Sequence, residues 1–199
     1  TRQQVREAAP SLTRISPERK RDELFRILDG REVSTAIRAL DQMGVLGYLL
    51  TELTRLKGVT QTAPHVHDVW EHTLAVLQNL ETVLGVLALN FQADKAASLA
   101  MGMLSHRLGR FRQAIHDHLA HRFTPDRSAR ALLFLAALYH DSGKPATRRV
   151  EPGGRVRYFG HEQAGEQVVH ERAVQLRLSG EEIERVSAVV AHHLRPILL

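Results

Sequence analysis

The strongest constraint on the fold is a run of nine apolar and aromatic residues, ALLFLAALY at 131–139, followed directly by His140 and Asp141. Side chains of these types are mostly buried in folded proteins. The run stands between Pro125 and a Ser-Gly-Lys-Pro turn signal, which predicts a core helix over residues 127–141. A carboxylate beside an imidazole at the end of such a helix is costly unless it is paired. A bound divalent cation would pair it, and a simple polar cap of the helix end is the alternative.

Helical apolar periodicity recurs along most of the chain and predicts an all-α fold. Ser16 and Pro17 fit the N-cap and first position of one helix, and Asp68 fits the N-cap of another. For the core helix, Thr124 or Asp126 is the expected cap. The predicted helices cover residues 17–29, 33–43, 45–57, 68–89, 94–121, 127–141, 161–178 and 181–193.

Apart from a loop expected from Gly58 to His67, the helical rhythm is interrupted near residues 147–159. Glu151-Pro152-Gly153-Gly154 is a turn signal with arginines on both sides. We therefore expect a small hairpin or an irregular loop there, within a helical bundle.

Composition excludes some classes of site and favours others. The 199 residues include no cysteine, which excludes disulfides and thiolate metal sites and is compatible with a reducing cytoplasm, the expected location. No apolar run approaches the roughly 18 residues of a membrane helix, so no membrane partner is expected. The net charge of +5 favours a polyanion such as RNA, with a solvated basic surface as the alternative.

Histidine is unusually frequent, with twelve residues. Histidines stand in four segments that belong to different predicted helices or helix starts: HVHDVWEH, LYHD, FGHE and AHH. Facing side chains of a helical bundle can build a metal site in this way. Imidazole and carboxylate ligands without thiolate fit Mn, Ni, Co, Fe, Zn or Mg.

The four segments also carry a family resemblance. HDVWEHTLAVL, LYHDSGKPATR, RVRYFGHEQAG and VVAHHLRP resemble the HD domain of bacterial tRNA nucleotidyltransferases (CCA-adding enzymes) and poly(A) polymerases. Upstream, RISPERKRDELFRIL and ALDQMGVLGYLLTELTRLKGV resemble the neck of that family. The resemblance implies a helical neck-like segment at residues 1–60 and an HD domain at 61–199, with a helical insertion near 90–125.

The resemblance implies a ligand set for a divalent metal ion. The late histidine of the family pattern matches His193 rather than His192, and we expect His65, His67 and His192 to be outside the ligand set. The expected ligands are His72, His140, Asp141, His161 and His193.

The implied activity is metal-dependent phosphohydrolysis, acting on phosphodiesters or phosphomonoesters, including nucleotides and 2′,3′-cyclic phosphates. Lys144, His161 and Asp141 are the expected catalytic residues. A metal ion would acidify a bound water and hold a phosphate oxygen, while Lys144 and His161 would lie where charge develops.

The sequence also departs from the family. The hallmarks of the nucleotide-adding head are a Gly-Ser-like loop, an Asp-x-Asp pair and a Glu-Asp-x-x-Arg motif, and none of them occurs here. We therefore expect no nucleotide addition from this chain alone. No aspartate follows Asp141, so the last ligand position of many HD enzymes is either filled by His193 or left open.

A second hypothesis is that the chain is a non-catalytic tRNA-binding module. Basic residues gather in three segments and would neutralise phosphates without reading sequence. The alternative is that these basic residues only form solvated helix faces and bind no RNA. The residues expected to bind RNA are Arg19, Lys20, Arg21, Arg107, Arg110, Arg148 and Arg149.

Overall fold

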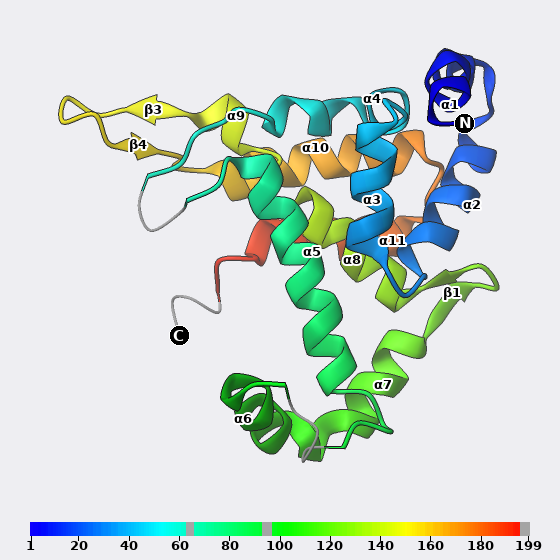
Figure 1. Cartoon of the computed structure of the whole chain (residues 1–199), viewed down its shortest axis with the longest axis vertical. Helices are drawn as coiled ribbons and strands as arrows, with labels where there is room; N and C mark the ends of the chain where they lie inside the picture. Colours follow the sequence, from blue (N-terminus) through cyan, green and yellow to red (C-terminus); the bar gives the residue numbers. More distant parts are fainter. Residues whose placement is uncertain (63–65, 93–96, 196–199) are drawn as a thin grey trace.

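A computed structural model describes residues 1–62, 66–92 and 97–195 (Figure 1). Helices dominate it, with two small antiparallel strand pairs, which confirms the all-α class. His65 lies outside the described residues. Within the described ranges, no helix is long and apolar enough to span a membrane.

The N-terminal segment comprises α1 (Arg2–Ala8), η1 (Ala9–Arg14) and α2 (Pro17–Leu28). The hydroxyl of Ser16 accepts from the backbone N–H of Arg19, so α2 is capped as the sequence predicts. One face of α2 buries Leu24, Phe25 and Leu28 and packs against the central helix α8 (Ala129–Tyr139).

Next come α3 (Val33–Gln42), α4 (Leu46–Leu49) and η2 (Thr51–Leu56). The helix predicted over 45–57 is therefore two short elements, because the fully buried Leu50 between them is not helical, with φ −134° and ψ 66°. The bend lets leucines on both sides of it reach the same core.

The core is organised around α8. It is in contact with α5 (Val69–Val86), α10 (His161–Gln175) and α11 (Gly180–His192). Nine of its eleven residues are buried, as its apolar sequence predicts. His140 and Asp141 follow the C-terminal end of α8, the helix around which α5, α10 and α11 pack.

The N-cap of α8 differs from the expected one. Ser128 caps the helix by accepting from the backbone N–H of Ala131, in place of Thr124 or Asp126. Two short strands precede the helix, β1 (Arg122–Thr124) and β2 (Arg127–Ser128), and they pair antiparallel. Residues 122–124 and 127–128 are extended in this pair and residues 125–126 form the turn between them, so the helix cannot begin earlier.

The helix predicted over 94–121 is broken, within the described residues, into α6 (Leu99–Leu108), η4 (Gly109–Phe111) and α7 (Arg112–Ala120). The Arg112 guanidinium donates to the Val86 carbonyl and, at 2.5 Å, to Ser105 Oγ, which fixes the bend against the end of α5. These elements lie at the far end of α5, away from its first turns (Figure 1).

After α8, the short helix α9 (Lys144–Thr147) leads into β3 (Arg149–Val150) and β4 (Val156–Arg157). The strands pair antiparallel, with Arg149 opposite Arg157. The expected hairpin is therefore present, and it extends from the helical body beside α9 and the start of α10 (Figure 1).

Candidate metal centre

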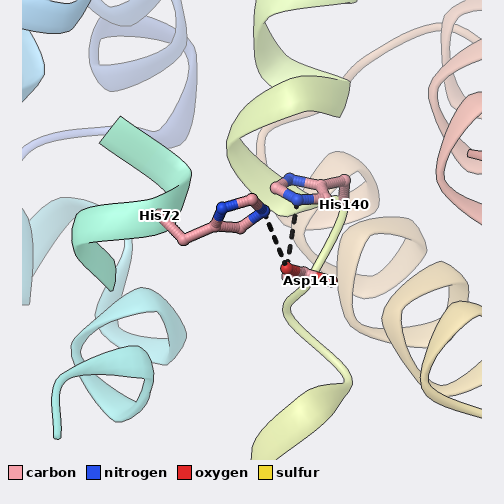
Figure 2. A group of neighbouring side chains, drawn as sticks. All are labelled: His72, His140 and Asp141. Carbon is pink, nitrogen blue, oxygen red and sulfur yellow. Dashed lines mark ion pairs between the residues drawn. The ribbon is translucent and has the colours of Figure 1, made fainter. Parts of the chain in front are cut away.

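Asp141 is the meeting point of ligand-type side chains from separate elements. His140 Nε2 lies 3.1 Å from Asp141 Oδ2, and His72 Nε2, on the first turns of α5, lies 3.6 Å from the same oxygen. Figure 2 shows both imidazoles directed at the carboxylate from α5 and the end of α8. The ring centroids of these two histidines are 5.5 Å apart.

The other carboxylate oxygen faces two further imidazoles. His161 Nε2 is 3.4 Å from Asp141 Oδ1, and His193 Nε2 is 3.9 Å from it. His161 is the first residue of α10, placed there by Gly160, whose φ of +76° favours glycine. His193 is the C-cap of α11. The structure thus brings all five expected ligands together around one carboxylate.

Backbone carbonyls orient three of the imidazoles in the same way. Nδ1 lies 2.7 Å from the carbonyl oxygen of the third preceding residue in His140, His161 and His193. A hydrogen bond donated by Nδ1–H to a carbonyl fixes the ring and leaves Nε2 as the acceptor, as in many metal sites. The three Nε2 atoms therefore face the Asp141 carboxylate.

The donor set fits a metal ion by a further test. Nε2 of His161 and Nε2 of His193 are buried and have no hydrogen-bond partner within the described part of the chain. Buried polar atoms are nearly always paired, so an unpaired cluster calls for a partner such as an ion. The ligand atoms lie within 4.8 Å of one another in two sets that share Asp141, one with His72 and His140, the other with His161 and His193.

The protonation of these groups also suits a metal. Asp141 is 2% exposed, and burial raises its pKa. The neighbouring imidazoles of His140 and His161 and the positive charge of Lys144 outweigh burial and hold the pKa well below its usual range. Burial lowers the pKa of His193, which favours the neutral ligating form. The site therefore presents an anionic carboxylate and at least one neutral imidazole.

Lys144 is part of the same cluster. Its Nζ donates to Asp141 Oδ2 and to Gln61 Oε1, both at 2.7 Å, and the side chain is buried. The ring of Tyr158 has its centroid 5.6 Å from the ammonium. Lys144 thus brings a fixed positive charge to the edge of the cluster.

The cluster opens into a cavity of about 530 Å³. Its lining includes the metal-ligand candidates and Lys144. It also includes β4 and the residues that join β4 to α10: Val156, Arg157, Tyr158, Phe159 and Gly160. The cavity is large enough for a phosphate ester with an organic substituent.

A polar network around the buried hydroxyl of Tyr139 was not predicted from the sequence. The Tyr139 hydroxyl donates to Glu52, and the Arg172 guanidinium donates to both oxygens of Glu52, with Nε at 2.7 Å. Burial raises the pKa of Glu52, but the hydrogen bonds from Arg172 and Tyr139 outweigh it and the pKa is lowered. The signal was a lone tyrosine ending an aliphatic run, since a buried hydroxyl needs a partner.

The residues expected to bind RNA lie in three separate places. Figure 1 places α2, the α6–η4 segment and the β3–β4 hairpin at different extremities of the molecule. Arg21 is engaged internally, with Asp22 at 2.8 Å and the Arg177 carbonyl at 3.1 Å, and Lys20 is half-buried. The remaining five are exposed: Arg19, Arg107, Arg110, Arg148 and Arg149.

The other described histidines are solvent-exposed. His67 and His192 are both exposed. The remaining members of this exposed group are His106, His116, His118, His121 and His170.

Comparison with known proteins identifies two segments. Residues 69–198 match the family model described as HD domain. Residues 1–57 match the model described as "Probable RNA and SrmB- binding site of polymerase A".

Similar whole proteins include a CC-adding tRNA nucleotidyltransferase of Thermus thermophilus, 31% identical over 178 residues, and an A-adding tRNA nucleotidyltransferase of Deinococcus radiodurans, 30% identical over 178 residues. Each alignment covers 89% of this chain and 31% of the relative. A bifunctional uridylyltransferase/uridylyl-removing enzyme of Phenylobacterium zucineum is 30% identical over 83% of this chain and 14% of that protein. The chain spans about a third of the length of the two tRNA nucleotidyltransferases. It belongs to the HD-domain family, and the segment ahead of that domain matches the polymerase A model.

Proposed function

We propose that this chain is a metal-dependent phosphohydrolase of the HD type, from a tRNA nucleotidyltransferase-like protein. The observation that carries the proposal is the convergence of four imidazoles on the two oxygens of Asp141, with two buried Nε2 atoms lacking hydrogen-bond partners among the described residues. We divide the chain into a neck-like segment, 1–60, and the HD domain, 61–199, and place the protein in the cytoplasm.

The residues that would hold metal fall into two sets. His72, His140 and Asp141 Oδ2 would hold one ion, and Asp141 Oδ1, His161 and His193 would hold another. When bound, a divalent ion would lower the pKa of a water ligand toward neutrality and withdraw charge from a phosphate oxygen. The shared carboxylate would make Asp141 the residue on which both sets depend.

The remaining chemistry falls to side chains that line the cavity. Hydrolysis joins the water oxygen to phosphorus, breaks one P–O ester bond and moves a proton to the leaving oxygen. The Lys144 ammonium lines the cavity and would stabilise charge on the phosphate oxygens. His161 has only Nε2 available, because Nδ1 is bonded to the Tyr158 carbonyl, so it would act either as a ligand or, when Nε2 is also protonated, as a proton donor.

The proposed substrates are phosphodiesters and phosphomonoesters, including 2′,3′-cyclic phosphates. The test is metal analysis of the purified chain, with hydrolysis of bis-p-nitrophenyl phosphate and 2′,3′-cyclic AMP in the presence of Mn, Ni, Co, Fe, Zn or Mg. We expect activity that chelation removes and that Asp141→Ala abolishes. The matched control is His192→Ala, which alters an exposed histidine beside His193.

Metal stoichiometry also separates the two roles of His161. His161→Ala lowers the metal content if the residue is a ligand and lowers only the rate if it is a proton donor. Hydrolysis that survives Asp141→Ala unchanged would show that the activity does not arise at this site.

A second candidate function is a non-catalytic tRNA-binding module. It is favoured by the match of residues 1–57 and by relatives named as tRNA nucleotidyltransferases. On this proposal the exposed arginines bind phosphates, and tRNA is the partner. Salt-sensitive tRNA binding without metal or hydrolysis would favour it over the enzyme.

A further inference from the structure

We propose that Phe159 and the arginines of the β3–β4 hairpin form a nucleotide subsite that presents the end of a single-stranded nucleic acid to the metal centre. The inference rests on the proposed phosphohydrolase for the reaction, whereas the binding of the strand is independent of hydrolysis. The subsite joins a base-stacking surface, a row of phosphate-binding side chains and the cavity above Asp141.

Phe159 supplies the stacking surface. It is 71% exposed, although it is a large aromatic residue, and it lines the same cavity as His72 and Asp141. The Arg157 guanidinium carbon lies 5.8 Å from the centroid of its ring. Aromatic rings next to arginine are the surfaces on which proteins stack unpaired bases. A base stacked on Phe159 would place its attached phosphate at the mouth of the metal cavity.

The hairpin supplies the charge for the following phosphates. Residues 148–157 contain four arginines, and Glu151 is the one acidic residue among them. Glu151 Oε1 lies 3.3 Å from Arg157 Nε, so the carboxylate is paired with that arginine. The other three, Arg148, Arg149 and Arg155, are exposed. A free phosphate or a mononucleotide has no further phosphates to occupy them, whereas a strand does.

The base of the hairpin is held in place before any ligand binds. The Tyr158 hydroxyl donates to the Thr60 carbonyl, and the Thr62 hydroxyl donates to the Val156 carbonyl at 3.4 Å. These contacts tie the wall that carries Phe159 to the segment before α5. A preformed wall reduces the cost of ordering on binding.

The first experiment measures binding alone. The anisotropy of a fluorescein-labelled pentaribonucleotide is followed with the purified full chain and no added metal. We expect Phe159→Leu to weaken binding about five-fold or more, the effect of losing one stacked base. The matched control is Phe111→Leu, because Phe111 is 44% exposed, lies on η4 and has the Arg110 guanidinium carbon 4.7 Å from its ring centroid. Unchanged binding by Phe159→Leu, or an equal loss in both variants, overturns the subsite.

The second experiment separates the base from the strand. 2′,3′-Cyclic AMP carries a base, glycerol 1,2-cyclic phosphate has the same cyclic ester without one, and a pentanucleotide ending in a 2′,3′-cyclic phosphate adds the strand. We expect Phe159→Leu to lower kcat/KM for the two base-containing substrates only. The double variant R149S/R155S should lower kcat/KM for the pentanucleotide only.

The outcomes distinguish the two proposals. A wild-type chain that hydrolyses none of these esters contradicts the phosphohydrolase, while the anisotropy measurement still decides the subsite. A wild-type chain that hydrolyses the pentanucleotide no better than glycerol 1,2-cyclic phosphate overturns the subsite and leaves the phosphohydrolase standing.

Discussion

Gly143 lies so close to the start of α10 that a Cβ atom on it would stand 2.1 Å from the carbonyl oxygen of His161. The same atom would be 2.5 Å from the backbone nitrogen of Gly165. Both neighbours are backbone atoms and cannot rotate away. This close approach brings the turn after Asp141 against α10, and so brings Asp141 within reach of His161.

We expect Gly143→Ala to lower the free energy of unfolding by about 1–3 kcal/mol or more, because overpacking a buried contact costs this much. The metal content should fall as well, since α10 would be displaced from Asp141. Urea unfolding and metal analysis check both effects. Gly153→Ala is the control, because a Cβ there meets nothing within 4 Å, and a cost below about 0.5 kcal/mol is expected. Equal stability of the two variants would contradict the packing argument.

We expect added divalent metal to raise the thermal unfolding temperature of the wild-type chain, because a ligand that binds the native state stabilises it by mass action. His193→Ala removes an imidazole of the Asp141 Oδ1 set and should reduce this rise. His192→Ala alters the exposed neighbour and should preserve it. Differential scanning fluorimetry with and without chelator makes the comparison. The same response in both variants would exclude His193 as a ligand.

We expect the acid sensitivity of the fold to depend on Glu52. Its folded-state pKa lies below the reference value of 4.5, so its contribution to stability is present above that value and is lost as the pH falls through the lower, folded-state pKa. Glu52→Gln removes the titrating group, so stability should fall less steeply below about pH 4.5. Urea unfolding between about pH 3 and 7 tests this. Glu23→Gln, on an exposed pair with Arg26, is the control and should keep the wild-type slope. An unchanged slope for Glu52→Gln would contradict the assignment.

We expect charge reversal at Arg107 and Arg110 to weaken the binding of RNA of any sequence alike, because phosphate contacts carry no base information. Each lost contact should reduce the slope of log K against log salt by roughly 0.7 to 0.9. Filter binding of tRNA between about 50 and 200 mM salt measures the slope. Arg185→Glu is the control, since it changes the charge on α11, where the arginine is paired with Glu181. If the control weakens binding as much, only the net charge matters.

Local features explain what could be predicted about the fold. Ser16 and Asp68 cap helices as expected, because capping depends on residues within one turn. The bend at Leu50 and the strand pair before Ala129 were not predicted. Both depend on what the rest of the molecule covers or pairs, and periodicity along the chain carries no such information.

The same division holds at the site. That the chain is helical and that His140 and Asp141 end its most apolar helix could be predicted, because both are properties of contiguous residues. Packing places His72 at one oxygen of Asp141 and His161 at the other, and it brings Glu52 to the hydroxyl of Tyr139. It also decided that the basic segments lie apart, with only the hairpin beside the cavity. These relationships join residues far apart in the chain, and they arise from how the helices pack around α8.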